Sequence, residues 1–278
     1  MRVLTQPGPV HPRRFEHFAG EARPLSFTVP AGVSLLDGLT APLAAAGFQS
    51  AVMRFGGARL DPFCYVMPDH AADAAHVAYF SAPRAPKGVT IVENAAATFG
   101  WDGDKPFLHC HAAWIEPDGR HRGGHILNGQ SRLAAPATVE AWAFDTIRIA
   151  TALDEETNFT LFQPSGVSTP GTNAVLARVR PNEDITIAIE TIARAHGLRD
   201  ATICGSVGSL VGTRFADGRD VPDRATEVQV LSGEVRDGRA ILDLASVDMK
   251  GEVHTGRIAR GENAVCITFD VMLLRRGN

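Results

Sequence analysis

The chain has 278 residues, of which 45% are hydrophobic and 21% charged, a balance typical of a globular protein with one large or two medium domains. Its formal net charge of −4 gives no overall attraction to nucleic acids or anionic membranes. No apolar run is long enough to span a membrane or to serve as a secretory signal, so we expect a cytoplasmic protein. The four cysteines stand far apart, which argues against a disulfide framework.

The first half of the chain predicts a short strand followed by a helix. Residues 25–30 precede Ser34, whose side chain can cap a helix that begins at the next residue. The apolar stripe of this helix consists of Leu35, Leu36, Leu39 and Leu43. Gly47 is expected to end the helix, and Pro42 should kink it.

Three histidines lie in a later segment of this half. Residues 107–115 form an apolar run that is best explained by a strand, on which His109 and His111 point to the same face. Residues 116–119 contain Pro and Gly at positions that favour a turn. The returning segment then brings His125 back towards the first two histidines, so a single hairpin would supply three imidazole nitrogens.

Three imidazoles without an obvious fourth protein ligand are typical of a metal centre that keeps one coordination position open. Tetrahedral nitrogen ligation favours zinc as the ion, with iron, nickel, copper and manganese as alternatives. The competing interpretation is that some of the ten histidines cluster by chance and are satisfied inside the core. The pattern by itself favours neither interpretation.

The second half repeats the order of elements. Residues 164–173 are rich in turn-forming residues and predict a linker. A segment at 176–181 leads to a helix with Asn182 at its N-cap and Gly197 just past its end. The apolar residues that follow the helical period are Ile185, Ala188, Ile189, Ile192 and Ala193.

Further short strands follow the helix in both halves. One helix followed by several strands, twice, predicts an α+β fold of two tandem domains, each a mixed or antiparallel sheet with one packed helix. We place the domains at residues 1–163 and 174–278, with the histidines in the first.

Two further residues are candidates for catalysis. Glu140 lies on a strand after the histidine hairpin and could act as a general base or as a partner to a metal-bound imidazole. The alternative is an ordinary strand carboxylate that faces solvent. Arg54 lies in an apolar strand and could hold a substrate carboxylate, although pairing with an acidic side chain of the protein is the commoner outcome.

The assembled motifs resemble the PPC (plant and prokaryote conserved) domain family. In the first copy, residues 107–112, 117–119 and 123–126 are similar to the family's Leu-His-Leu-His, Asp-Gly and Gly-Gly-His segments. In the second copy, residues 226–233 are similar to its Glu-Ile-Leu-Ser-Leu-Ser-Gly segment. The resemblance covers nearly the whole chain in two tandem PPC-like copies.

This resemblance implies a compact α+β domain, a trimer as in prokaryotic members of the family, and zinc at the histidine motif as in some of them. By that similarity His109, His111 and His125 are the metal ligands. The second copy departs from the pattern, because alignment on the glycine turns places Asp243 and Arg257 where His111 and His125 stand. An internal ion pair, an anion contact or a plain structural role would each explain that departure.

Two functions follow as hypotheses. The first is a metal-dependent enzyme of the hydrolase, hydratase or lyase type that acts on a small anionic metabolite, in which Glu140 moves a proton and Arg54 holds the substrate. The second is a non-enzymatic DNA-associated or assembly module, because plant relatives join this domain to AT-hook segments; this chain has no Arg-Gly-Arg-Pro core. A metal with a purely structural role at a trimer contact is the third possibility.

Overall fold

The computed structural model describes residues 1–276, which form two helices, two large sheets and two short two-stranded ribbons. The helices are α1 (Leu35–Ala45) and α2 (Ile185–Ala195). The first sheet has ten strands: β2 (Arg23–Val29), β3 (Ser50–Phe55), β4 (Ala58–Leu60), β5 (Tyr65–Val66), β8 (Thr90–Asp102), β9 (Lys105–Ile115), β10 (His121–Ile126), β11 (Ala137–Phe144), β12 (Ile147–Leu153) and β13 (Thr160–Gly166).

The second sheet has eight strands: β1 (Phe15–Gly20), β14 (Ala174–Val179), β15 (Ala201–Ile203), β16 (Val207–Leu210), β19 (Thr226–Arg236), β20 (Arg239–Val247), β21 (Val253–Arg257) and β22 (Val265–Arg275). The ribbons pair β6 (Pro68–Asp69) with β7 (Tyr79–Phe80), and β17 (Thr213–Arg214) with β18 (Asp220–Val221). Nearly all neighbouring strands are antiparallel; β12 meets β8 in parallel at one position.

The two sheets share one strand order. The first runs β2-β11-β3-β8-β9-β10 and the second β14-β22-β15-β19-β20-β21, so that corresponding strands occur in the same sequence along the chain. Each helix follows the first strand of its set. Two differences from the predicted boundaries are visible: β1 pairs with β14 at the edge of the second sheet, and β13 extends to Gly166, inside the predicted linker.

The helices begin and end nearly where the sequence predicts. Ser34 caps α1 by accepting a hydrogen bond from the backbone N–H of Asp37. The predicted N-cap of α2 is wrong: Asp184, not Asn182, caps it, and accepts from the N–H groups of Thr186 and Ile187. A carboxylate is an equally good cap, and Asn182 instead binds the backbone of Leu4 near the amino terminus. Within residues 1–276 neither helix is long and apolar enough to cross a membrane.

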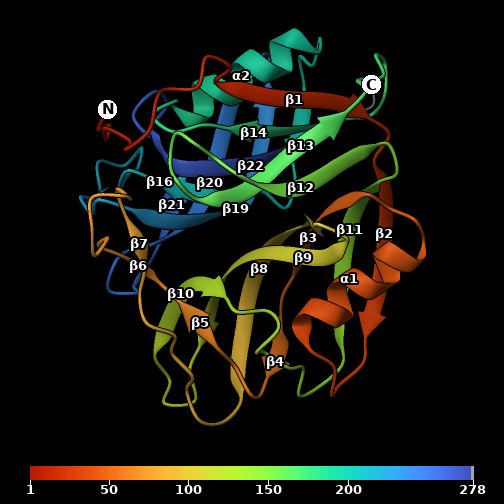
Figure 1. Cartoon of the computed structure of the whole chain (residues 1–278), viewed down its shortest axis with the longest axis vertical. Helices are drawn as coiled ribbons and strands as arrows, with labels where there is room; N and C mark the ends of the chain where they lie inside the picture. Colours follow the sequence, from red (N-terminus) through yellow and green to blue (C-terminus); the bar gives the residue numbers. More distant parts are fainter. Residues whose placement is uncertain (277–278) are drawn as a thin grey trace.

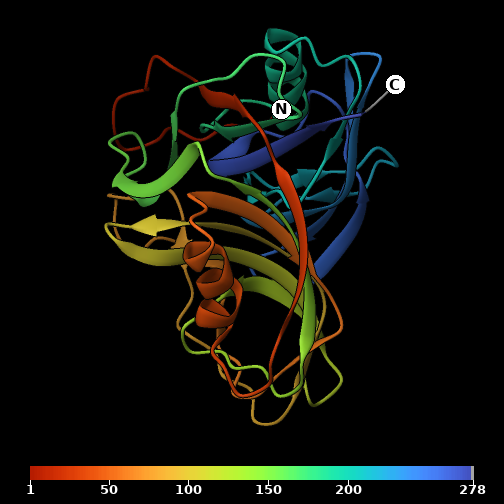
Figure 2. The same cartoon turned by 90° about the vertical axis from the view of Figure 1, so that its right-hand side faces the viewer.

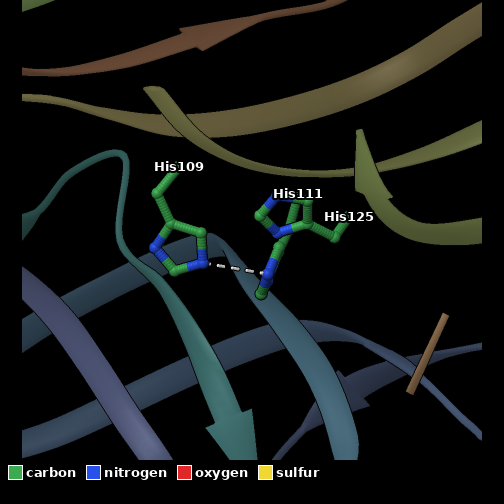
Figure 3. Close-up of side chains that lie close together, drawn as sticks. All are labelled: His109, His111 and His125. Carbon is green, nitrogen blue, oxygen red and sulfur yellow. Dashed lines mark hydrogen bonds between the residues drawn. The ribbon is translucent and has the colours of Figure 1, made fainter. Parts of the chain in front are cut away.

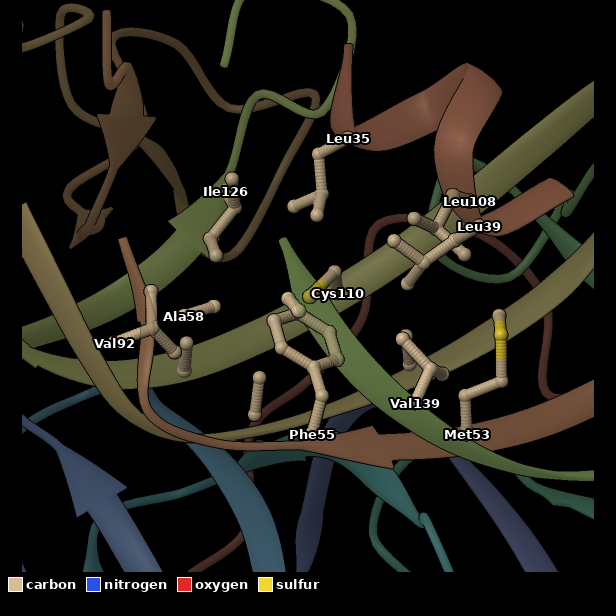
Figure 4. Packing of buried hydrophobic residues seen from close by; sticks show 14 of the residues in the cluster. Leu35, Leu39, Met53, Phe55, Ala58, Val92, Leu108, Cys110, Ile126 and Val139 are labelled. Atoms are coloured by element: carbon tan, nitrogen blue, oxygen red, sulfur yellow. The ribbon is translucent and has the colours of Figure 1, made fainter. Parts of the chain in front are cut away.

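The helices cover the outer faces of the sheets, and the inner faces meet. Side chains alternate along β9, so that Leu108 and Cys110 contact the core under α1 (Figure 4). His109 and His111 point the other way and contact residues of the second sheet. α2 packs on the far face of the second sheet, at the top of Figures 1 and 2. The apolar cluster between the sheets draws on both of them and includes Val52, Phe144, Ile147, Leu176, Cys204 and Met272.

Candidate metal centre

The structure brings the three histidines together on the inner face of the first sheet (Figure 3). His109 and His111 lie two residues apart on β9, and His125 on β10 stands directly opposite His111 in the strand register. Because side chains alternate along a strand and register partners share a face, all three rings point into the space between the sheets. Their candidate ligand atoms lie within 4.8 Å of one another, so one ion can reach all three.

Hydrogen bonds from the second sheet fix the orientation of two of these rings. Nδ1 of His111 lies 3.0 Å from the carbonyl oxygen of Val228 on β19, and Nδ1 of His109 lies 3.2 Å from a carboxylate oxygen of Asp270 on β22. A carbonyl oxygen can only accept, so Nδ1 of His111 carries the proton and its Nε2 carries a lone pair. Such outer partners are the usual means by which metal-binding histidines are held in one tautomer.

The spacing of the nitrogens fits a bound ion. Nε2 of His109 lies 3.1 Å from Nε2 of His111. Zinc–nitrogen bonds of 2.0–2.1 Å in a tetrahedral site place two ligand nitrogens about 3.3 Å apart. The buried Nδ1 of His125 also has no hydrogen-bond partner among the described residues. A cation bound between the three rings would give a partner to the two facing Nε2 atoms and to the unpartnered nitrogen of His125.

Burial keeps the imidazoles in the form that binds metals. Loss of solvent, together with the charge of His109, lowers the pKa of His125 to about 3. The same causes, with the charge of His125 added, hold the pKa of His111 well below its usual value. Both rings are therefore neutral at physiological pH, as ligation requires.

A carboxyl group that the sequence analysis missed also faces this site. Glu227 on β19 is buried, and its Oε2 has no hydrogen-bond partner within residues 1–276. Burial raises the pKa of this carboxyl to about 8. It lies against the histidine hairpin, since a Cβ on Gly124 would stand 3.5 Å from its Oε2. Asp270 interrupts a run of apolar residues in its strand, a signal that could have identified it, whereas Glu227 lies between Thr226 and Val228 in a more polar strand.

A cavity of 230 Å³ opens beside the histidines, between the two sheets. Its walls are mostly apolar side chains from both halves of the chain, and Phe80 lies with its ring centroid 5.6 Å from that of His125. Asp270 and Glu227 are the acidic residues that line it, and neither lysine nor arginine does so within residues 1–276.

The two predicted catalytic residues lie elsewhere. Arg54 on β3 and Glu140 on β11 are cross-strand partners, and their side chains pair at 2.6 Å with 56% and 52% exposure. In the sheet, β11 is three strands from β9, which at about 4.8 Å per strand places Glu140 about 14 Å from the histidine strand. Neither residue lines the cavity. The expected roles of Glu140 as a base beside the metal and of Arg54 as the anchor of an anionic substrate are therefore corrected.

In the second half, Asp243 on β20 stands opposite Arg257 on β21, in the same register as His111 and His125. Their side chains form an ion pair at 3.2 Å and are 34% and 59% exposed. The ion pair, one of the three outcomes considered for this hairpin, is what the structure contains.

Neither a family model nor a curated protein matches this sequence, but several solved structures do. A plant- and prokaryote-conserved (PPC) protein from Pyrococcus horikoshii is 17% identical, over 56% of this chain and 97% of that chain, with a TM-score of 0.41. A metal-containing protein from Archaeoglobus fulgidus is 18% identical, over 54% and 99%, with a TM-score of 0.43. A protein from Ralstonia eutropha named as a candidate DNA-binding protein is 15% identical, over 52% and 96%, with a TM-score of 0.37. One of the solved structures to which this chain is similar is thus a PPC protein, from the family that its motifs resemble.

Proposed function

We propose that this protein binds a divalent transition metal, with zinc as the first choice, through His109, His111 and His125. The observation that carries the proposal is the pair of Nε2 atoms 3.1 Å apart, on rings whose Nδ1 atoms are held by Asp270 and by the backbone of Val228. Three nitrogen ligands leave a coordination position free for water or a small molecule. The cavity beside the histidines gives such a molecule room.

We also propose that the chain is a tandem duplication, with units close to residues 1–163 and 174–278. The repeated strand order and the matched position of each helix support this. In this arrangement the first unit supplies the histidines and the second supplies the wall that faces them, through β19 and β22. The strand β1 is the exception, because it comes from the first unit and completes the edge of the second sheet.

The chemistry that fits the site is that of a metal-dependent hydrolase or lyase. A bound metal would either activate water to attack a small molecule or polarise a carbonyl group of that molecule. This chain would contribute three uncharged ligands, the Asp270 carboxylate that orients His109, and the Glu227 carboxyl at the cavity wall. Glu227 takes the place that we had assigned to Glu140 as the group able to hold or move a proton, because it lines the cavity and its Oε2 is unpartnered.

Metal content tests the proposal directly. We expect protein purified without added metal to contain about one transition-metal ion per chain by inductively coupled plasma mass spectrometry. The variant His111→Ala should lose it. His121→Ala is the matched control, because His121 lies on β10 but pairs with Glu93 at 2.6 Å, outside the cavity. Equal metal contents in the two variants, or none in the unaltered protein after incubation with zinc, would contradict the proposal.

The second candidate function is a DNA-associated or assembly module, in which the metal is structural and the chain forms a trimer. The name of the Ralstonia eutropha protein supports the DNA-binding version, and the net charge of −4 weakens it. A DNA gel shift repeated at rising salt concentration separates the two functions. The module is favoured if the protein binds DNA at low salt and loses it as salt increases, and if replacing the metal ion changes no small-molecule turnover.

A further inference from the structure

We propose that the cavity beside the three histidines binds a small molecule with a single aromatic ring and one donor group, uncharged or singly charged, that points at the histidines. The inference deepens the proposed function by naming a ligand class, and only the donor group depends on a bound metal. Three independent features of the cavity support it: its size, the chemistry of its walls and its charges.

The size of the cavity limits the ligand to about one ring. A closed apolar cavity of about 150 Å³ accepts benzene, whereas pockets for drug-sized molecules measure about 300–1,000 Å³. The volume of 230 Å³ lies between these limits. A benzene ring with a short substituent fits inside this volume, whereas a nucleotide would extend beyond it.

The walls are unusually aromatic for so small a space. The rings that line it are Tyr79, Phe80, Phe107, Phe159 and Phe162. Phe80 lies 5.6 Å from His125 and Phe162 lies 6.5 Å from His109, measured between ring centroids. Tyr79 and Phe159 stack at 5.5 Å. Centroid separations of 4.5–7 Å are those at which aromatic pairs attract, so a ligand ring next to the histidines would meet favourable edges and faces.

The charges around the cavity disfavour a ligand with two negative groups. Its lining, within residues 1–276, holds the carboxyls of Asp270 and Glu227 and neither lysine nor arginine. Arg54, which the sequence analysis had assigned to an anionic substrate, is paired with Glu140 outside the cavity. Among the lining residues that the structure describes, no lysine or arginine adds to the positive charge of a bound ion, and one donor group suffices to meet that ion.

Matched hydroxamates test the ring directly. Benzohydroxamate and acetohydroxamate bind a metal through the same donor atoms and differ by a phenyl against a methyl group. With cobalt-loaded protein, in which the visible absorption of the ion reports ligation, we expect benzohydroxamate to bind at least about tenfold more tightly, since one methylene in an apolar pocket already confers such a factor. Equal affinities, or tighter binding of the dianion malonate, would overturn the proposal.

A measurement on metal-free protein tests the aromatic ligand class independently of the proposed metal site. Saturation-transfer NMR on chelator-treated protein should show contact with the ring protons of benzyl alcohol and none with ethanol. If the protein binds no metal but this contact persists, the proposed metal site is wrong and the aromatic cavity stands. If metal binds and benzyl alcohol shows no contact, the metal site stands and the aromatic ligand class is wrong.

Variants locate the binding. Phe80→Ala and Phe159→Ala each remove a ring from the wall, and both should reduce the preference for benzohydroxamate over acetohydroxamate by about fivefold or more. Phe80 is 41% exposed, so its replacement should leave the fold intact even if that of Phe159 does not. Leu231→Ala is the matched control, at 39% exposure and outside the cavity, and should leave the preference unchanged. An unchanged preference in both phenylalanine variants would contradict the assignment.

Discussion

The hairpin β9–β10 of the first sheet and the hairpin β20–β21 of the second have the same backbone and different chemistry. Their turns are closed by matching hydrogen bonds, from Glu116 N–H to Arg120 O in one and from Asp248 N–H to Glu252 O in the other. Each has a glycine with positive φ one residue before the position that differs: Gly124 at 147° precedes His125, and Gly256 at 153° precedes Arg257.

What separates the two hairpins is the surface that covers them. The first faces β19 and β22, which supply the Val228 carbonyl and the Asp270 carboxylate to its imidazoles. The second leaves its Asp243–Arg257 pair substantially exposed, and an exposed ion pair contributes little to stability. The repeated backbone thus provides the same positions for side chains in both hairpins. The neighbouring sheet determines whether the side chains at those positions are buried and held in one orientation.

The largest expected effect comes from the two glycines. In Gly124→Ala the new Cβ would lie 2.4 Å from the backbone oxygen of Val66, which cannot move without disturbing β5. In Gly256→Ala it would meet the guanidinium of Arg219 at 2.7 Å, which can swing away. With the strain of positive φ common to both, we expect losses in the free energy of unfolding of about 4 kcal/mol for the first and about 2 kcal/mol for the second.

Urea unfolding of the metal-free variants measures this difference. The outcome that would break the comparison is an equal loss in both, because the two hairpins would then be equally constrained by their surroundings.

A pH-dependent effect is expected at Glu227. Its folded pKa of about 8 is raised above the value of about 4.5 for an exposed carboxyl, so between these values the folded state binds more protons than the unfolded state. Stability contributed by this group is complete below about pH 4.5 and is lost as pH rises towards 8. We expect Glu227→Gln, which cannot ionise, to gain stability relative to the unaltered protein across this window, by about 3 kcal/mol between pH 4.5 and pH 7.

Unfolding of metal-free protein at pH 5, 6, 7 and 8 checks the sign. Glu140→Gln is the control for the chemical change itself, because Glu140 is half-exposed and lies outside the cavity. A difference for Glu227→Gln that shrinks as pH rises would show that the carboxylate, not the protonated acid, is the stable form in the folded protein.

Removal of the Asp270 carboxylate, which contacts Nδ1 of His109, should weaken metal binding moderately. Asp270→Asn keeps a hydrogen-bond acceptor but removes the negative charge at 3.2 Å from Nδ1, and changes of this kind cost about 10–100-fold in metal affinity. Asp243→Asn makes the same chemical change in the hairpin β20–β21 and should leave the metal affinity unaltered. Competition with a chromophoric chelator measures both, and equal affinities for the two variants would place the ion away from His109.

The sequence predicts the local features of this molecule better than its contacts across the two halves. The helix α1, its Ser34 cap and the hairpin that joins His111 to His125 follow from periodicity, capping and turn chemistry, all of which act over a few residues. The positions of Glu140 and Arg54 depended on which strands become neighbours. Chain order does not reveal that β3 and β8 separate β11 from β9.

The residues that the second sheet contributes to the site could not be predicted from the sequence for a related reason. Asp270 lies more than a hundred residues from His109, and nothing in its local sequence shows what it faces. Only the packing of one sheet on the other brings Asp270, Val228 and Glu227 to the histidines. A search for polar residues that interrupt apolar strands would have found Asp270, although not its partner.

The smallest effect is expected where the sequence analysis had placed the catalytic pair. Arg54→Ala and Glu140→Ala each break an ion pair that is more than half exposed, so each should change the free energy of unfolding by less than about 1 kcal/mol. Metal content and hydroxamate affinity should stay at the level of the unaltered protein, because neither side chain lines the cavity. A loss of hydroxamate binding in Arg54→Ala, at unchanged stability, would return this arginine to the site. It would also remove the contrast between the covered, histidine-bearing part of this sheet face and its solvated part at β3 and β11.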